Sequence, residues 1–288
     1  MQEAVMADEA NTVIELTGVS KVFGSYLRKV NALSDIDLVI KKGRVCALLG
    51  PNGAGKTTMI KIILGLLKPS SGKMNILGEK EMTKNLKENL GFLPEESYLY
   101  PFLTIQETLE FAAGLYKNKQ DNLQRIDSVL DLVGLKQFKT RKISQCSKGM
   151  ARRTAFAQAI IHDPDLIILD EPTSGYDPIG TAEVKRIIKQ LRDQGKTVIL
   201  CSHQLADVEE VCDDVVILYG GQIISRGEMN ELLKEERQIG YSVDSKHANA
   251  LNAWLAEQEI DCREIPVSQL EKYFIHQIGK CTQEQLLS

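Results

Sequence analysis

Long hydrophobic runs are missing from this chain of 288 residues. No apolar stretch approaches the roughly 20 residues that a membrane-spanning helix needs. The first residues, MQEAVMADEANTV, are acidic and lack the apolar centre of a secretory signal peptide. We therefore expect the protein to remain in the cytosol.

Paired cysteines and a basic charge balance are also missing. The six cysteines are scattered and form no C-x-x-C pair, so neither a disulfide framework nor a zinc site is indicated. Cys262, His276 and Cys281 lie near one another and are a candidate metal site, but reduced, partly buried thiols are the favoured interpretation. The net charge of -4 gives no positive footprint for a nucleic-acid backbone. Nucleic acid is therefore not an expected partner.

The alternation of short apolar runs with helix-like stretches predicts the fold class. Over residues 13–237, runs such as VCALLG and LIILD alternate with longer amphipathic segments, which indicates an α/β domain with a mainly parallel sheet. Within residues 94–161 the strand signals stop and helical periodicity takes over, which predicts an inserted helical subdomain. The pair Gly220-Gly221, between VVILY and QIIS, predicts a hairpin turn.

The two ends of the chain differ from this domain. We expect residues 1–12 to form an N-terminal tail and residues 238–288 to form a small C-terminal α/β extension, because the composition shifts after KEER at 234–237. The extension should hold a helix from His247 to Gln258, an extended piece around Ile265 and a last helix containing LEKYFIHQI.

A glycine-rich segment, GPNGAGKT, has the spacing G-x-x-x-x-G-K followed by Ser or Thr. It lies between an apolar strand, VCALL, and a helix-like run, TMIKIILGLL, which is the setting of a phosphate-binding loop. Glycines let backbone N–H groups surround phosphates, and the helix N-terminus adds positive potential. A mere glycine-rich turn would not require the lysine and the hydroxyl at these offsets. The predicted ATP-binding residues are Gly50, Pro51, Asn52, Gly53, Ala54, Gly55, Lys56, Thr57 and Thr58.

Individual side chains of this loop have distinct expected roles. Lys56 would reach the β- and γ-phosphates, and the hydroxyl of Thr57 would bind Mg²⁺. Thr58 would help to hold the α-phosphate.

Two carboxylates follow a second apolar strand, Leu166–Leu169. Asp170 and Glu171 would lie at the carboxyl end of a parallel strand, where α/β proteins bind ligands. Asp170 suits the Mg²⁺ shell, and Glu171 suits the polarisation of an attacking water. A solvated strand end is the alternative for an isolated Asp-Glu pair, and the phosphate-binding loop makes it the weaker interpretation.

Five further segments, in the same order along the chain, make this sequence resemble the ABC ATPases over residues 13–235. Cys146-Ser147-Lys148-Gly149-Met150 is similar to the family's signature motif, and Ser174-Gly175-Tyr176-Asp177 is similar to its D-loop, where most members have Leu in place of Tyr176. The resemblance implies that Ser147 and Gly149 contact the γ-phosphate of ATP bound to another subunit.

Three single positions complete the resemblance. His203, after the strand TVILCS, matches the switch histidine, which contacts the γ-phosphate and holds the glutamate in place. Phe23 occupies the place of the aromatic that stacks on adenine, with Tyr26 as a substitute and core packing as an alternative role. Glu95, in GFLPE, replaces the usual Q-loop glutamine, and a carboxylate there can still bind Mg²⁺ or its water.

The resemblance also implies partners. One signature and one phosphate-binding loop per chain require a homodimer or pseudo-homodimer, which ATP would close and hydrolysis would reopen. Residues 98–104 would receive a membrane-spanning subunit encoded on another chain, although Tyr100 and Phe102 fit a core role equally well. The implied protein is a P-loop ATPase of ABC type, with an antiparallel β subdomain, that uses ATP and Mg²⁺.

Glu95 and the stretch SQLEKYF at 268–274 are similar to export ATPases, so an exporter at the inner face of the cell membrane is the leading hypothesis. A soluble ABC factor of translation or DNA maintenance is the alternative, but such proteins usually carry two cassettes, a coiled coil or zinc modules, and a basic surface. A catalytically idle regulatory subunit would be expected to lack Glu171 or His203. Both are present.

Overall fold

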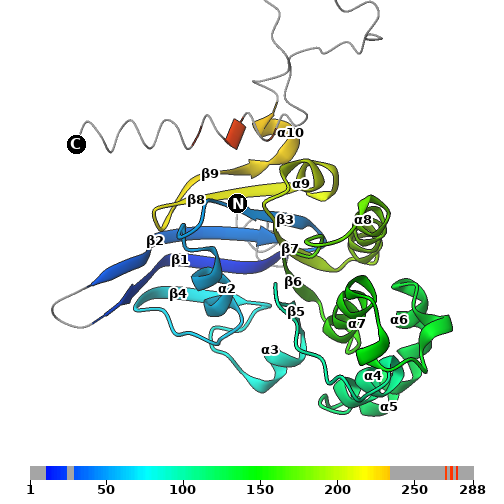
Figure 1. The fold of residues 1–288 in the computed structure, drawn as a ribbon. Helices are drawn as coiled ribbons and strands as arrows, with labels where there is room; N and C mark the ends of the chain where they lie inside the picture. The colour runs from blue at the N-terminus through cyan, green and yellow to red at the C-terminus, as the bar shows by residue number, and fades with distance from the viewer. Residues whose placement is uncertain (1–10, 25–28, 234–269, 271–272, 275–276, 278–288) are drawn as a thin grey trace, which may run out of the picture.

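A six-stranded sheet forms the centre of the protein in the computed structural model, which describes residues 11–24, 29–233, 270, 273, 274 and 277 (Figure 1). The strand order is β5-β6-β7-β3-β8-β9, parallel from β5 to β8 with β9 antiparallel at one edge. The strands are β3 (Val45–Leu49), β5 (Leu90–Leu93), β6 (Leu166–Asp170), β7 (Thr197–Cys201), β8 (Asp214–Tyr219) and β9 (Gln222–Glu228). The expected mainly parallel sheet is therefore confirmed.

A second sheet of three antiparallel strands packs against the first. Its order is β2-β1-β4, with β1 (Thr12–Phe23), β2 (Val30–Lys41) and β4 (Ser71–Ile76). Along β2, the buried residues Leu33, Ile36, Leu38 and Ile40 alternate with more exposed ones, because a strand with one face on a core buries every second side chain. This sheet is the predicted antiparallel β subdomain.

The larger sheet is covered on both faces, which explains its continuous apolar strands. Cys46 and Leu48 of β3 join one core with the smaller sheet and helix α2 (Lys56–Ile63). Val45, Ala47 and Leu49 face the opposite core. That core contains helix α8 (Pro178–Asp193) and helix α9 (Leu205–Val211).

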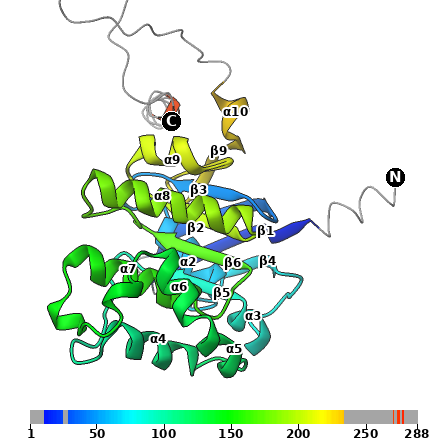
Figure 2. The ribbon, with the colours of Figure 1, turned by 90° about the vertical axis from the view of Figure 1, so that its right-hand side faces the viewer.

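Helices replace strands between β5 and β6, as the periodicity predicts. They lie beside the sheets, below α8 in Figure 2. The segment contains α4 (Ile105–Ala113), α5 (Lys119–Gln124), α6 (Ile126–Leu132), the 3-10 turns η1 (Lys136–Phe138) and η2 (Ile143–Gln145), and α7 (Lys148–Ile160). Helix α4 begins with a capping box, in which Thr104 and Glu107 exchange hydrogen bonds.

The remaining elements are short. Helix α3 (Lys84–Glu88) precedes β5, and α10 (Met229–Leu232) follows β9. The hairpin between β8 and β9 is confirmed, with positive φ at both Gly220 and Gly221. Among the described residues, no helix combines the length and the apolar character needed to cross a membrane.

A few residues near the C-terminus are described, and they contact the main body. Leu270 and Tyr273 are helical and buried, and the Tyr273 hydroxyl lies 2.7 Å from Ser225 Oγ on β9. The helix expected at 247–258, the extended piece around Ile265 and the candidate metal residues Cys262, His276 and Cys281 lie outside the described residues. The division into 1–12, 13–237 and 238–288 stays a proposal.

Candidate active site

The predicted catalytic segments meet at one edge of the larger sheet. The phosphate-binding loop follows β3, Asp170 ends β6, His203 follows β7 and Glu95 follows β5. Since β5, β6, β7 and β3 are parallel neighbours, their carboxyl ends lie side by side. Segments more than 100 residues apart in sequence therefore share one site.

The glycines of the phosphate-binding loop have positive φ and tight surroundings. Gly50, Gly53 and Gly55 have φ values of 152°, 83° and 108°. A Cβ on Gly50 would collide with the carbonyl oxygen of Leu218, and one on Gly55 would stand 2.7 Å from that of Ala32. A Cβ on Gly53 would meet nothing within 4 Å. Gly50 and Gly55 are therefore needed where the loop passes close to neighbouring backbone, whereas Gly53 is needed only for its positive φ.

Lys56 begins α2 and lies across its own loop. Its Nζ donates hydrogen bonds to the carbonyl of Gly50 and, at 3.2 Å, to that of Pro51. Burial lowers the pKa of Lys56, while the nearby charges of Glu171 and Asp170 act in the opposite direction. The ammonium is therefore held close to both the loop and the carboxylates. Thr57 and Thr58 follow in the first turn of α2.

Glu171 has an unusual backbone for a non-glycine residue, with a φ of 49°. Its N–H donates to the carbonyl of Cys201 at 2.9 Å, and its carbonyl accepts from the N–H of Ser174 at 3.2 Å. Only 8% of the residue is exposed, and this burial raises the pKa of its carboxyl group. Left-handed backbone at a buried glutamate costs about 1 kcal/mol or more and is typical of functional sites.

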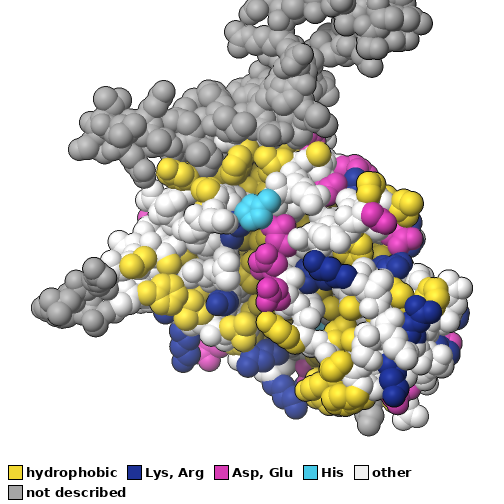
Figure 3. Space-filling view, viewed as in Figure 1, with side chains coloured by type: hydrophobic (Ala, Val, Ile, Leu, Met, Phe, Trp, Pro, Cys, Tyr) yellow, Lys and Arg dark blue, Asp and Glu magenta, His cyan; other side chains and the backbone are white. Residues whose placement is uncertain are grey.

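His203 lies beside this carboxylate. Its Nε2 lies 3.4 Å from Glu171 Oε1, and its backbone N–H donates to Oε2, also at 3.4 Å. The charge of His203 opposes the burial effect on the pKa of Glu171. On the face drawn in Figure 3, a histidine stands beside a row of acidic side chains. The predicted pairing of His203 with Glu171 is thus present in the geometry.

Asp170 and Glu95 interact electrostatically. Burial is the main reason that the pKa of Asp170 is raised, and the charge of Glu95 raises it further, while Lys56 lowers it. Glu95 is exposed on the loop after β5. The two acids are therefore close enough for the charge of Glu95 to act on Asp170, and carboxylate oxygens are suited to a hard cation.

The signature-like residues lie at the N-terminus of α7. Ser147 caps α7, accepting a hydrogen bond from the N–H of Met150 at 3.2 Å, and it is exposed. Gly149 and Tyr176 belong to a groove of about 540 Å³ that also includes Glu95 and Lys148. The Tyr176 hydroxyl donates to the Gly149 carbonyl at 3.4 Å. The groove thus joins the signature-like and D-loop-like segments within one chain.

Phe23 is 41% exposed, so the core interpretation does not hold. Phe23 ends β1 and pairs with Val30 of β2. Val30 is two residues before Ala32, and the carbonyl of Ala32 lies beside Gly55 of the phosphate-binding loop. Lys21 Nζ lies 5.3 Å from the centre of its ring. The ring therefore stands on the surface near the phosphate-binding loop. Its substitute, Tyr26, lies outside the described residues.

Tyr98, Tyr100 and Phe102 are also exposed, by 90%, 51% and 66%. The core interpretation of Tyr100 and Phe102 is therefore wrong. The Tyr100 ring packs edge-on against Phe111 of α4, with ring centres 5.8 Å apart. These residues form an aromatic patch beside the loop that carries Glu95.

Sequence reasoning missed Arg152. This side chain of α7 reaches the backbone of both Asp170 and Glu171, with its Nη2 at 2.9 and 3.1 Å from their carbonyl oxygens. In sequence it is one of two adjacent arginines in CSKGMARR, and nothing there distinguishes it from Arg153, which instead pairs with Glu183 at 2.8 Å.

Comparison with known proteins gives a consistent result. The model of the ABC transporter family matches residues 33–174. An uncharacterized ABC transporter ATP-binding protein of Synechocystis is 41% identical, over 85% of this chain and 71% of the relative. The bacitracin transport ATP-binding protein of Bacillus licheniformis is 34% identical, over 90% of this chain and 83% of the relative.

Solved structures agree with this assignment. The dimeric, post-hydrolysis structure of the ATP-binding cassette MJ0796 with ADP and phosphate superposes with a TM-score of 0.67 at 26% identity, covering 75% of this chain and 98% of that one. The family match, the relatives and the fold thus point to one family. The chain belongs to the ATP-binding subunits of ABC transporters, which are ATPases coupled to transport.

Proposed function

We propose that the sheet edge described above is the site of ATP hydrolysis. The observation that carries this proposal is the convergence of Lys56, Asp170, Glu171 and His203 from three neighbouring parallel strands. Residues 50–58 would surround the phosphates with backbone N–H groups, and Phe23 would stack on the adenine. Lys56 would place a positive charge beside the β- and γ-phosphates.

Mg²⁺ fits the donors present. The Thr57 hydroxyl at the start of α2, the carboxylate of Asp170 and the carboxylate of Glu95 are oxygen ligands, and the charge of Glu95 raises the pKa of Asp170. The bound ion would neutralise charge on the phosphate oxygens. Thr57, Asp170 and Glu95 are proposed to hold it directly or through water.

Glu171 would act on the attacking water. A buried carboxylate with a raised pKa is a stronger proton acceptor than a solvated one, and it is suited to orienting water in line with the γ-phosphate. His203, through its ring and its backbone N–H, would fix the rotation of that carboxylate and contact the γ-phosphate. Lys56, Glu171 and His203 are thus the proposed catalytic residues.

The second half of the site would come from another chain. Ser147 and Gly149 lie at the N-terminus of α7 rather than at the sheet edge, and Ser147 is exposed. There its hydroxyl and the helix N-terminus would meet the γ-phosphate of ATP on a second subunit. The dimeric arrangement of the MJ0796 cassette supports this proposal. Two such chains, identical or related, would be closed by ATP and opened by hydrolysis.

A membrane-spanning subunit on a separate chain would use this movement. The exposed aromatic patch of Tyr98, Tyr100 and Phe102 would receive it, because exposed aromatic side chains are favoured anchors at interfaces. The protein would then lie at the inner face of the cell membrane. We propose export as the direction, supported by the similarity of Glu95 and of the stretch at 268–274 to export ATPases. No observation favours the soluble alternative.

Affinity purification from gently solubilised membranes tests this function. We expect a polytopic membrane protein to co-purify, and ATP hydrolysis by the complex to be lost in Lys56→Ala. Lys61→Ala, at an exposed lysine of the same helix, is the matched control and should leave hydrolysis intact. Recovery of ribosomes, DNA or no partner would contradict the transport role and leave the ATPase assignment standing.

A further inference from the structure

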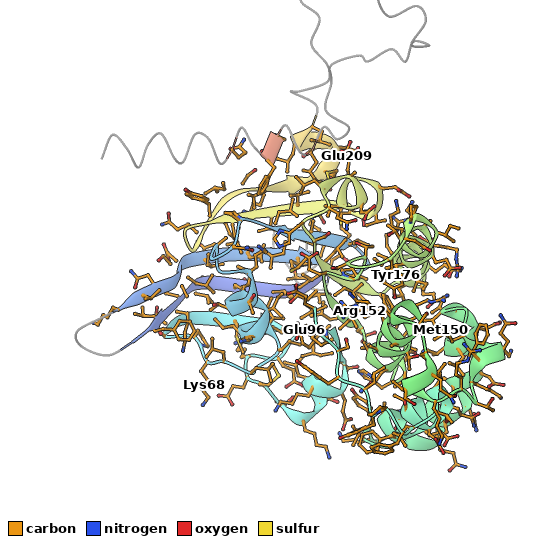
Figure 4. The ribbon with its side chains drawn as sticks, viewed as in Figure 1. Lys68, Glu96, Met150, Arg152, Tyr176 and Glu209 are labelled. Atoms are coloured by element: carbon orange, nitrogen blue, oxygen red, sulfur yellow. The ribbon has the colours of Figure 1, made fainter. Side chains whose placement is uncertain are left out.

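Arg152 is hydrogen-bonded to two segments, the loop after β5 and the backbone at the end of β6. Figure 4 places it between α7 and the strands of the larger sheet. Its Nη1 donates to the carbonyl of Pro94 at 2.5 Å and to Ser97 Oγ at 3.0 Å, both on the loop that carries Glu95. Its Nη2 donates to the carbonyls of Asp170 and Glu171. One planar guanidinium therefore spans four acceptors on two segments, which a lysine cannot do.

The position of these acceptors gives the contact a specific consequence. Glu171 keeps a left-handed backbone, and this conformation sets the direction of both its carbonyl and its side chain. Arg152 holds the carbonyl, while His203 contacts the carboxylate of the same residue. Loss of the carbonyl contact would let the peptide relax toward ordinary φ values, and the carboxylate would rotate away from the γ-phosphate position.

The loop side of the contact is next to the aromatic patch. Ser97 immediately precedes Tyr98, and Glu95 and Glu96 separate Ser97 from Pro94. A displacement of this loop would pull on the guanidinium and through it on Asp170 and Glu171. Burial of the guanidinium disfavours its charge and lowers its pKa, while the charges of Tyr176, Asp170, Glu95 and Glu171 favour it. Arg152 is partly buried, and the hydrogen bonds of its two terminal nitrogens offset the cost of removing its charge from water.

We propose that Arg152 is a positioning residue for ATP hydrolysis, which ties the loop 94–97 to the backbone of Glu171 and so makes the orientation of the catalytic carboxylate depend on the position of that loop. This inference rests on the proposed role of Glu171. In this proposal Arg152 acts through its four hydrogen bonds to the loop and to the backbone of Asp170 and Glu171 rather than through a contact of its own with ATP.

The matched pair Arg152→Ala and Arg153→Ala tests the proposal on the full chain with Mg²⁺ and ATP. The two arginines are neighbours on α7, but Arg153 contacts Glu183 and the carbonyl of Val133 instead of the site. We expect Arg152→Ala to lower kcat about 100-fold, as a misplaced catalytic group does, with a KM for ATP close to the parent value. Arg153→Ala should keep the parent kcat. Arg152→Lys retains the charge but not the two-pronged guanidinium, so its kcat should lie between those of Arg152→Ala and Arg153→Ala.

A double variant separates positioning from a general loss of structure. If Arg152 acts through Glu171, then Arg152→Ala adds no further loss of kcat in the Glu171→Gln background, because the group it positions is already gone. Ser97→Ala removes one of the two loop contacts of Arg152 and the 3.4 Å hydrogen bond from Ser97 Oγ to the carbonyl of Pro94, and it should lower kcat less than Arg152→Ala does. Thermal melting of every variant with ATP identifies any that does not fold, in which case Arg152→Lys and Ser97→Ala carry the test.

Each result decides one assignment. Equal kcat in Arg152→Ala and Arg153→Ala, or additive losses with Glu171→Gln, would overturn the positioning role. A parallel fall in kcat, ATP affinity and melting temperature for both Arg152→Ala and Arg152→Lys would reduce Arg152 to a structural residue. Parent-like hydrolysis by Glu171→Gln itself would remove the proposed role of Glu171. A slow Glu171→Gln beside a parent-like Arg152→Ala would remove only the present inference.

Discussion

The sheet edge and the N-terminus of α7 both carry residues predicted to contact ATP, yet the chain surrounds them very differently. At the sheet edge, Glu171 is buried and Lys56 is hydrogen-bonded to its own loop. At α7, Ser147 is exposed, and so is Ile179 at the start of α8, by 74%. The first region is organised within one chain, whereas the second leaves its groups exposed.

This difference separates the sheet edge, whose geometry is set by folding, from the N-terminus of α7, whose contacts with ATP are proposed to depend on assembly. Parallel strands fix the first group through their shared hydrogen bonds, so its geometry exists before any partner binds. The exposed group is supported from below by the cap of α7 and by the ring of Tyr176. Substitutions in the two regions should therefore affect different steps.

Glu171→Gln should have the largest effect, a fall in kcat of about 1,000-fold, because it removes the proton acceptor without changing the shape of the site. ATP binding should remain, so that ATP-bound dimers accumulate in size-exclusion chromatography. Glu81→Gln, at an exposed glutamate before α3, is the control for loss of one negative charge. Dimers that fail to accumulate would show that the sheet edge alone does not set hydrolysis.

Ser147→Ala should lower hydrolysis about 100-fold, in line with the loss of one donor to a developing negative charge. ATP binding by the single chain, measured by nucleotide fluorescence, should not change. This outcome would separate the α7 region from the sheet edge. Weakened ATP binding by the isolated chain would place Ser147 in the same half-site as Lys56.

Mixing Lys56→Ala and Ser147→Ala chains sharpens the same comparison. Each chain is inactive alone, but a mixed dimer of identical folds has one site with both defects and one with neither. With random pairing, half of the dimers are mixed and each retains one of two sites, so about one quarter of the parent ATPase activity should return. No return of activity on mixing would contradict a site shared between chains.

Glu171→Gln should also stabilise the fold near neutral pH. Burial raises the pKa of Glu171 above its ordinary value of 4.5, so the folded state favours the protonated form. The ionised carboxylate therefore lowers stability as pH rises through the raised pKa, and the neutral amide avoids this loss. Melting temperatures should rise by about 2 to 4 °C for each kcal/mol gained. The gain in melting temperature should shrink toward pH 4.5. A gain that does not change with pH would contradict a raised pKa of Glu171 in the folded state.

Tyr176→Leu should have the smallest effect. It removes the 3.4 Å hydrogen bond to Gly149 and a ring that packs so closely on Gly180 that a Cβ added there would stand 2.5 Å from it. Stability should therefore fall by about 1 kcal/mol. Hydrolysis should persist, since Leu is the usual residue at this place in the ABC ATPases that the chain resembles. Tyr176→Phe isolates the hydroxyl. A loss of ATPase activity in Tyr176→Phe would give the hydroxyl a role beyond packing.

Much of the fold and the sheet-edge site could be predicted from the sequence because their signals are local. Buried parallel strands read as unbroken apolar runs, and the residues that follow them mark the edge where ligands bind. The apolar runs of β3 and β6 are thus sufficient to locate Lys56, Asp170 and Glu171. The order of the strands brings His203 beside Glu171, which spacing alone only suggested.

Other features could not be predicted, for equally physical reasons. The acceptors of Arg152 are mainly backbone carbonyls, which every residue possesses, so no residue type marks them. The left-handed backbone of Glu171 leaves no trace in a sequence that has no glycine there. Tyr100 and Phe102 are apolar enough for a core, yet both are exposed, with the Tyr100 ring edge-on against Phe111 of α4.

The backbone conformation of Glu171 has a consequence for laboratory evolution. Glycine and asparagine adopt positive φ more readily than glutamate, and neither brings a buried charge. A library selected only for thermal stability should therefore enrich Gly or Asn at position 171. The selected proteins should melt at a higher temperature and should not hydrolyse ATP. Selection for thermal stability would have to be paired with a screen for ATP hydrolysis, since Glu171, the proposed catalytic residue, lowers the stability of the fold.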